Sequence, residues 1–462
     1  MAHSDYYGDN DGYGAGVNDD FFRFNISRDR AVKRDLGVGD DVVGISADYA
    51  VKQVRLTFTS AEVGNALALD SNTMLNQDGG LAVRVQAEDG TGSLVGPVSR
   101  FDDEGITFES NGSFTFDVRD LVSGAERGAY FDTVELGTKG ADVIDESFSR
   151  ESYYINAGMG DDRVTGGYRN DFLVGGAGND KLNGREGNDT FIGGGGNDDI
   201  IGGSGKDTAI FNVATDGSDK VNLGTGLDTV NVAAPVVASQ IRLSFTSSEV
   251  GNGIATDSNT MLNQDGGLAV RLKAEDGNGN LSGLVSRFDD EGISFVSTTP
   301  GVTFDVRDLV SGVQRGDQFN VVELGTKGND RFNEAGESEA YYINAGMGND
   351  TLIGGVSKDF LVGGVGSDRI DGRQGDDSLL GGADADVFVF RGVTGNDRVL
   401  DFVSGVDKFD FSAFNIGFDD ILTSKSGTET LIDVNSDADA AYDFQIRLVN
   451  GATPVESDFI FA

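Results

Sequence analysis

The sequence predicts an all-β protein with two parallel β-rolls of nonapeptide repeats, each preceded by a β-sandwich-like domain. First, an aspartate returns every ninth residue inside a glycine frame in two runs, residues 158–207 and 346–386. Second, the segments before both runs alternate apolar and polar residues, which is typical of half-buried strands. Third, residues 71–80 recur unchanged at 258–267. A short fixed period indicates a solenoid, and the recurrence indicates that sandwich and roll were duplicated together.

These patterns divide the chain into six expected segments. The N-terminal extension is rich in Tyr, Gly and Asp, a composition typical of mobile tails, and ends in an expected edge strand or short helix. Acidic and glycine-rich turns, one of them at 102–105, are expected between the short strands of each sandwich. The segments are an extension at 1–46, a sandwich-like domain at 47–136, a roll with its cap at 137–232, a second sandwich-like domain at 233–324, a second roll with its cap at 325–411, and a C-terminal region at 412–462.

The repeat unit is Gly-Gly-x-Gly-x-Asp-x-apolar-x, plainest in GGAGNDKLN at 175–183. Its glycines permit a tight turn with positive φ, and the aspartate adds a charged oxygen. Hard oxygen ligands of this kind suit Ca²⁺. The apolar eighth position should form the buried strand of each turn, at Leu173, Leu182, Phe191, Ile200, Ala209, Leu361, Ile370, Leu379 and Phe388.

On these residues the chain resembles the RTX family of secreted calcium-binding proteins, over about a third of its length. In that family, neighbouring turns share their calcium ions. The resemblance therefore implies that the repeat aspartates bind several Ca²⁺ ions, with incomplete sites at the ends. The implied ligands are Asp142, Asp162, Asp171, Asp180, Asp189, Asp198, Asp207, Asp330, Asp350, Asp359, Asp368, Asp377 and Asp386.

Five residues depart from the repeat. Arg169 replaces the fourth-position glycine, Arg185 and Arg373 replace the second-position glycine, and Ser357 and Asp384 also interrupt the frame. The resemblance leaves calcium binding at those turns open.

Composition narrows the class of protein. The formal charge is -42, with 77 acidic and 35 basic residues, which argues against binding to nucleic acid or to an anionic membrane. Cysteine is absent, so neither disulfides nor thiolate metal sites support the fold. Calcium is then the expected stabiliser, because stacked carboxylates repel one another until cations fill the roll.

The two ends of the chain bear on export. Residues 1–16 are polar and lack the apolar core of a signal peptide, so Sec export is not expected. The segment after Asp386 resembles the C-terminal part of serralysin-type RTX domains, which seals the roll and leads to an uncleaved secretion signal. The ending, with Asp458 before an apolar tail, resembles substrates of type I secretion machinery. An ordinary final strand of a packed domain is the alternative, and both can hold.

The sequence offers little for catalysis. The one histidine, His3, lies in the polar tail, so neither a histidine triad nor a two-histidine metal site can form. No carboxylate pair stands out as a glycosidase site. We therefore expect no enzyme.

These observations favour a secreted structural protein of a Gram-negative cell surface or extracellular matrix. In this interpretation calcium drives folding, and the duplicated units, as a homo-oligomer or polymer, build a surface layer or filament. A calcium-dependent adhesin or carbohydrate-binding module, with surface polysaccharide as partner, is the main alternative. A polysaccharide-acting enzyme is a third reading.

Overall fold

The structure is a computed structural model and shows an all-β solenoid in two compact units. The units comprise Met1–Gly226 and Leu227–Ala462. Among the described residues there is no α-helix, and no helix has the length and apolar character needed to cross a membrane. The described residues are 21–26, 33–34, 38–46, 53–58, 81–88, 94–110, 114–120, 125–213, 216–233, 240–245, 268–275, 281–290, 292–308, 313–392, 394–436 and 442–462.

The first unit begins with strands that form two sheets around one core. In one sheet, β3 is parallel to β1 and β6, and β6 is antiparallel to β9. In the other, β4 lies between β5 and β7, with β6 beyond β5 and β8 beyond β7. The strands are β1 (Phe21–Asn25), β2 (Lys33–Arg34), β3 (Val38–Ser46), β4 (Gln53–Phe58), β5 (Leu81–Glu88), β6 (Leu94–Ser110), β7 (Thr115–Asp120), β8 (Ala125–Phe131) and β9 (Thr133–Leu136).

Strand β6 joins the two sheets. Its first half pairs with β5 and its second half with β3 and β9. The sequence-based turn at 102–105 is therefore wrong, because the chain continues as a strand through Gly105, whose φ is +68°. A local change of backbone at a glycine lets one strand pass from one sheet to the next. Phe108 on β6 and Phe116 on β7 are both fully buried in the shared core.

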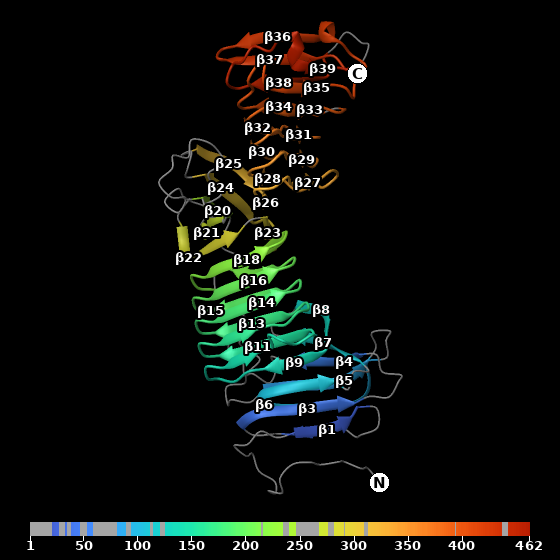
Figure 1. The fold of residues 1–462 in the computed structure, drawn as a ribbon, viewed down its shortest axis with the longest axis vertical. Helices are drawn as coiled ribbons and strands as arrows, with labels where there is room; N and C mark the ends of the chain where they lie inside the picture. The colour runs from blue at the N-terminus through green and yellow to red at the C-terminus, as the bar shows by residue number, and fades with distance from the viewer. Residues whose placement is uncertain are drawn as a thin grey trace. The chain divides into compact units, whose positions relative to one another are not determined.

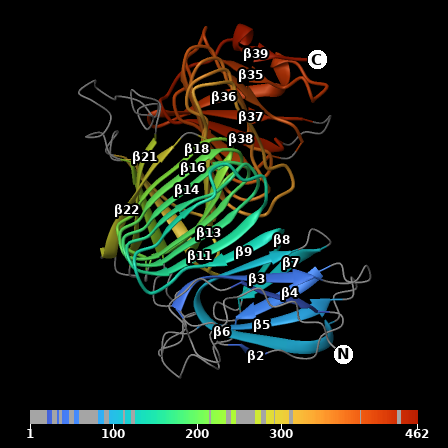
Figure 2. The same ribbon diagram turned by 60° about the horizontal axis from the view of Figure 1, so that its bottom comes forward.

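The first roll continues directly from this sheet, because β9 is parallel to β11 (Figure 2). Two parallel stacks make the roll, β11-β13-β15-β17 and β10-β12-β14-β16-β18 (Figure 1). The strands are β10 (Val143–Asp145), β11 (Tyr153–Met159), β12 (Arg163–Thr165), β13 (Phe172–Ala177), β14 (Lys181–Glu186), β15 (Thr190–Gly195), β16 (Asp199–Ser204), β17 (Thr208–Asn212) and β18 (Lys220–Thr225).

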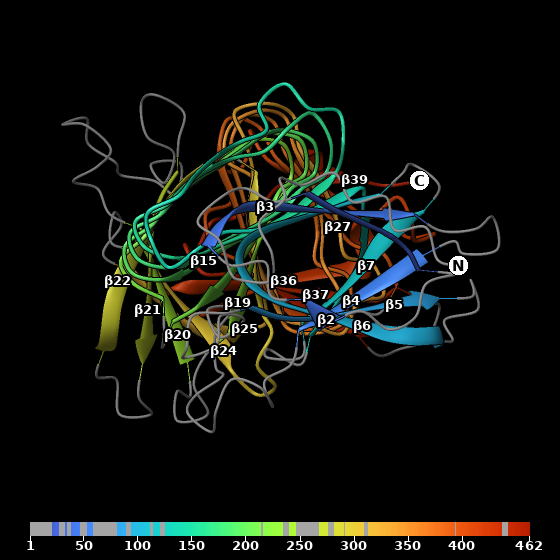
Figure 3. The same cartoon turned by 90° about the horizontal axis from the view of Figure 1, so that it is seen from below.

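Neighbouring strands of a stack are two repeats apart. Leu173 is in register with Phe191, and Leu182 with Ile200, so one coil contains eighteen residues. Successive coils superpose in the view of Figure 3. The prediction for the eighth position is confirmed, since all nine side chains named for it are buried, none more than 4% exposed.

The second unit repeats this plan. β23 is parallel to β19 and antiparallel to β26, and β26 leads into the parallel stack β28-β30-β32-β34. β27, β29, β31, β33, β35 and β39 form the facing parallel stack. The strands to this point are β19 (Asp228–Ala233), β20 (Gln240–Phe245), β21 (Leu268–Glu275), β22 (Leu281–Asp290), β23 (Ile293–Ser297), β24 (Thr303–Asp308), β25 (Val313–Phe319), β26 (Val321–Leu324), β27 (Arg331–Asn333), β28 (Tyr341–Asn344), β29 (Thr351–Ile353), β30 (Phe360–Val365), β31 (Arg369–Asp371), β32 (Ser378–Ala383), β33 (Val387–Val389), β34 (Asn396–Val399) and β35 (Lys408–Asp410).

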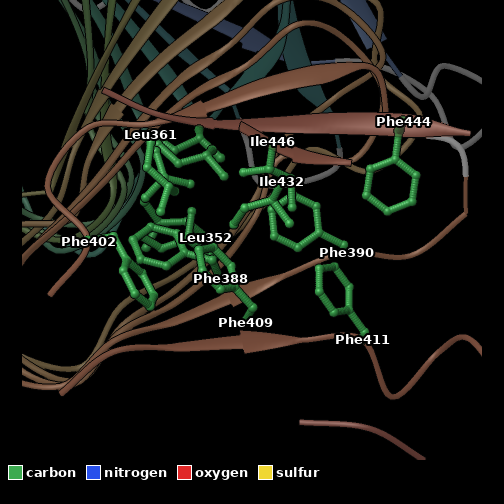
Figure 4. Close-up of a cluster of buried hydrophobic side chains, with 14 of the residues drawn as sticks. Leu352, Leu361, Phe388, Phe390, Phe402, Phe409, Phe411, Ile432, Phe444 and Ile446 are labelled. Atoms are coloured by element: carbon green, nitrogen blue, oxygen red, sulfur yellow. The ribbon is translucent and has the colours of Figure 1, made fainter. Parts of the chain in front are cut away.

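The C-terminal segment closes the second roll with an aromatic core. Phe409 stacks on Phe402 (Figure 4), with ring centroids 4.3 Å apart. It also stacks on Phe459, at 5.4 Å. Asp458 is fully buried and accepts hydrogen bonds from Oγ of Ser404 at 2.6 Å and from a backbone N–H at 3.0 Å. The remaining elements are η5 (Phe418–Asp420), β36 (Ile421–Ser426), β37 (Glu429–Val434), β38 (Phe444–Leu448), η6 (Glu456–Asp458) and β39 (Phe459–Ile460).

Candidate metal centre

The thirteen aspartates named from the sequence lie at the ends of the turns, inside the two rolls. Eleven are at most 2% exposed, whereas Asp142 and Asp330 are half-buried. Their burial follows from the repeat, because each aspartate stands two residues before the buried apolar position. Nearly complete burial of so many carboxylates is unusual and requires compensating partners.

From Asp162 onward, one oxygen of each repeat carboxylate in the first roll is held by the backbone of the previous coil. The N–H of Asp162 donates to Oδ1 of Asp180 at 2.8 Å, and the N–H of Asp180 donates to Oδ1 of Asp198 at 2.9 Å. Asp142 donates in the same way to Asp162 at 2.8 Å. We call such a series of N–H to Oδ1 hydrogen bonds along the coils a file. A second file runs from Tyr153 through Asp171 and Asp189 to Asp207, with N to Oδ1 distances of 2.7–2.8 Å.

The second roll contains the same two files. One runs from Asp330 through Asp350 and Asp368 to Asp386, with distances of 2.7, 2.8 and 3.0 Å. The other runs from Tyr341 through Asp359 to Asp377, at 2.9 and 2.8 Å. The structure thus brings the predicted residues together as four ladders along the coils.

Three further aspartates extend the ladders and were missed as ligands by sequence reasoning. Oδ1 of Asp219 accepts from Asp198 at 2.9 Å, Oδ1 of Asp397 from Asp377 at 3.0 Å, and Oδ1 of Asp407 from Asp386 at 3.1 Å. All three follow a glycine by two residues, as in the repeat unit, although they lie 20 or 21 residues after their ladder partners instead of eighteen. That spacing is the signal that could have identified them.

The second oxygen, Oδ2, separates two kinds of turn. In the first kind, which we call closed, Oδ2 accepts the N–H of the residue four positions earlier. Gly167 donates to Asp171 and Gly355 to Asp359, both at 2.7 Å. Thr138 closes the turn of Asp142 and Thr326 that of Asp330, also at 2.7 Å.

In the second kind, which we call open, Oδ2 is buried and accepts no hydrogen bond. Such an oxygen carries a full desolvation cost unless a cation or a proton offsets it. Eight aspartates have this arrangement: Asp162, Asp180, Asp189, Asp198, Asp350, Asp368, Asp377 and Asp386.

Backbone conformation follows the same division. Every open turn has positive φ at repeat positions two and four, as at Gly176 (+112°) and Gly178 (+137°) before Asp180. The turn before Asp207 shares this pair, at Gly203 and Gly205. In the closed turns of Asp142, Asp171, Asp330 and Asp359, neither position has positive φ. The turn of Asp407 is also closed, by the N–H of Val403 at 2.7 Å, and there only position four, Gly405, has positive φ (+85°). Since φ orients the peptide that carries a residue's own N–H, positive φ at position two turns this N–H away from the carboxylate.

The departures from the repeat divide between the two kinds. Arg185, Arg373 and Asp384 adopt positive φ, +80°, +70° and +80°, and so preserve open turns where glycine is missing. Arg169 and Ser357 stand in closed turns. The replaced glycines therefore do not all have the same consequence for the backbone.

Burial is the largest cause of the raised pKa values of these carboxyl groups. It raises the pKa of Asp189 to about 8 and that of Asp377 to about 9, with neighbouring aspartates adding to the shift. In the closed turns, two backbone N–H groups oppose burial, and the pKa of Asp171 and that of Asp359 rise only to about 6. The open carboxylates have one backbone donor instead of two, and most of them reach a higher pKa, although that of Asp368 also rises only to about 6.

The open turns have the donor set that Ca²⁺ prefers. A Cβ atom at Gly175 would lie 2.5 Å from Oδ2 of Asp180 and 2.6 Å from the carbonyl oxygen of Gly193, so carboxylate and carbonyl oxygens of different turns lie close together. Among the described residues, no three acidic or histidine side chains converge on one point. A cation at Oδ2 would therefore take most of its ligands from backbone carbonyls, which calcium accepts.

A second, exposed ladder runs beside the carboxylates. The N–H of Asn197 donates to Oδ1 of Asn179 at 2.9 Å, and the N–H of Asn179 donates to Oδ1 of Asp161 at 2.8 Å. The second roll has the same contact between Asn349 and Asn329 at 2.8 Å. Sequence reasoning missed this ladder, although an Asn or Asp directly before the repeat aspartate was its visible signal.

Comparison with known proteins bears on the repeats. The model of the RTX calcium-binding nonapeptide repeat matches four times, at residues 156–191, 175–209, 342–361 and 353–388. None of the curated proteins compared with the chain matches it.

Two solved structures show similarity at low scores. The AlgE6R3 subunit of the mannuronan C5-epimerase from Azotobacter vinelandii is 27% identical over 30% of this chain and 81% of its own, with a TM-score of 0.19. Extracellular lipase LipA from Serratia marcescens is 18% identical over 69% of this chain and 41% of its own, with a TM-score of 0.18. Neither score supports an argument about structure or activity. The family match stands on its own: both units of this chain carry the RTX calcium-binding nonapeptide repeat.

Proposed function

We propose that this is a secreted structural protein whose two rolls bind Ca²⁺ and depend on it for folding. The observation that carries the proposal is the set of eight buried Oδ2 atoms without hydrogen-bond partners, repeated along both rolls. Their mutual repulsion in a chain of charge -42 opposes folding, and bound cations remove this cost. The match to a calcium-binding repeat supports calcium as the cation.

The free energy of calcium binding then contributes directly to the free energy of folding. Sites of extracellular modules bind Ca²⁺ with dissociation constants of roughly 10⁻⁴ to 10⁻³ M. At such affinities the chain stays unfolded in a calcium-poor cytoplasm and folds after export, when it meets millimolar calcium.

The test is a calcium titration of the EDTA-treated full chain, followed by circular dichroism. Calcium should restore the β signal of the rolls, whereas sodium at matched ionic strength should not, because screening supplies no coordination. Full β content and an unchanged melting temperature in EDTA would contradict the proposal.

We further propose that the calcium-loaded protein is a subunit of a surface layer or filament. Two units with the same repeated sequence offer similar surfaces, and heterologous contacts between such surfaces propagate when the rotation does not close. Assembly should need at least as much calcium as folding, because the surfaces are anionic. Light scattering and electron microscopy at millimolar calcium test this, with a variant lacking residues 1–18 to test bridging by the extension. A saturated, folded protein that stays monomeric at high concentration would favour the adhesin instead.

Export by type I secretion machinery through residues 412–462 completes the proposal. The direct test fuses this segment to an unrelated passenger and compares secretion with a passenger that carries the first roll instead. Retention of the first fusion inside the cell would exclude an export address in this segment.

A further inference from the structure

We propose that the two rolls contain two functionally different kinds of turn, and that only the open turns bind calcium. This inference rests on the proposed calcium function and restricts it to part of the repeat aspartates. The closed turns, which end at Asp142, Asp171, Asp330, Asp359 and Asp407, would be held by hydrogen bonds alone. The metal-binding turns end at Asp162, Asp180, Asp189, Asp198, Asp207, Asp350, Asp368, Asp377 and Asp386.

The closed carboxylates of Asp171 and Asp359 already have both oxygens engaged by backbone donors, and in Asp142 and Asp330 a threonine hydroxyl donates to Oδ1. Oδ1 of Asp171 accepts from Tyr153 at 2.8 Å and Oδ2 from Gly167 at 2.7 Å. Asp359 has the equivalent contacts at 2.9 and 2.7 Å. A cation placed at Oδ2 would face the positive end of an N–H dipole, which repels it. The hydrogen bonds also replace the stabilisation that a cation would bring.

The next aspartate of the same file shows the contrast. Asp189 receives the N–H of Asp171 at Oδ1, at 2.8 Å, but its Oδ2 is buried without a donor. The residue is 1% exposed, so water cannot take the place of a partner from the surface. Positive φ at Arg185 and Gly187 has turned the backbone donor away. Asp207 is assigned to the open group on its backbone conformation alone.

The open conformation persists where the local sequence opposes it. The left-handed region is strained for an arginine, and yet Arg185 and Arg373 both adopt it. Conversely, Gly167 and Gly355 could adopt positive φ without strain and do not. The open conformation therefore occurs where the residue type does not favour positive φ. This is what we expect if the metal-binding coils require that conformation.

Four of the closed turns stand at the start of a file, and the fifth, at Asp407, stands at the end of a file in the second roll. Asp142 and Asp171 are the first carboxylates of the two files in the first roll, and Asp330 and Asp359 are the first in the second. Both rolls therefore begin with one closed turn per file. We read these turns as metal-independent caps on which the calcium-dependent coils stack.

Matched asparagine variants test the inference in the full-length protein. Asp189→Asn is paired with Asp171→Asn, and Asp377→Asn with Asp359→Asn. Asparagine keeps an acceptor for the ladder N–H but removes the charge that a cation needs. Bound calcium per molecule is measured by equilibrium dialysis against saturating radiolabelled calcium, and folding is checked by circular dichroism. Asp189→Asn and Asp377→Asn should lose at least one ion each, whereas Asp171→Asn and Asp359→Asn should keep the wild-type count.

The outcomes separate this inference from the calcium function itself. Wild-type protein that binds no calcium would overturn the proposed function. Wild-type binding together with a reduced count in Asp171→Asn or Asp359→Asn, or a full count in Asp189→Asn, would overturn only the division into two kinds of turn. If a closed-turn variant does not fold, Asp142→Asn and Asp330→Asn give the same test at half-buried positions, where substitution disturbs the core less.

Discussion

The backbone N–H of Asp162 donates to Oδ1 of Asp180, one full coil later, at 2.8 Å. This bond fixes the carboxylate of one coil to the backbone of the previous one and leaves Oδ2 of Asp180 for another partner. Removing the whole carboxylate of Asp180 should therefore lower the stability of the protein more than removing its charge alone. We expect Asp180→Asn to lower calcium affinity and Asp180→Ala to lower stability by a further 1–3 kcal/mol or so, because the buried N–H loses its acceptor. Urea unfolding of both variants in saturating calcium measures the difference, and equal midpoints would contradict it.

Acid should stabilise the metal-free protein. Burial raises the pKa of Asp189 to about 8 and that of Asp377 to about 9, from the ordinary aspartate value of 3.8. The folded state therefore binds more protons than the unfolded state between pH 4 and pH 8 or so, and stability falls as pH rises through that window. Melting in EDTA at about pH 5.5 and about pH 8 should give the higher midpoint at the lower pH.

Calcium should reverse this dependence on pH. The ion binds the ionised carboxylate, so calcium affinity rises as protons leave. Calcium titrations at the same two pH values show whether calcium affinity rises with pH. An affinity that did not change with pH would show that the buried carboxylates are not the ligands.

Glycine at position 185 should stabilise the first roll. Arg185 has φ +80°, and Arg185→Gly removes this strain, for a gain of about 1 kcal/mol that the lost contact with Tyr168 partly offsets. Arg169→Gly is the matched control, because Arg169 does not have positive φ and gains nothing from glycine. Thermal midpoints in saturating calcium should rise for the first variant only.

The aromatic core that closes the second roll should be essential to the stability of the second unit. Phe409 is fully buried between Phe402 and Phe459, so Phe409→Ala should cost about 3–5 kcal/mol. Leu422→Ala, at a side chain 47% exposed in the same unit, is the control and should cost far less. Chemical unfolding in calcium measures both, and similar losses would exclude a structural role for the stacked rings.

The sequence by itself determined the solenoid, the duplication and the residues that line the rolls. The repeat period and the apolar eighth position are local properties, and they predicted the burial of Leu173 and Phe191 and the alignment of the aspartates. Asp397 and Asp407 also follow a glycine by two residues, but they lie 20 and 21 residues after Asp377 and Asp386 instead of eighteen, and this break in the period hid their place in the ladders.

Only the tertiary structure decided which turns are open. Gly166 and Gly167 begin a repeat just as Gly175 and Gly176 do, yet the first turn is closed and the second is open. The turn that contains Arg185 is open although it lacks the second-position glycine. The reason is that peptide orientation in a turn depends on hydrogen-bond partners in the coils before and after it, eighteen residues away. The passage of β6 between two sheets is likewise set by pairing with distant strands, which no local pattern encodes.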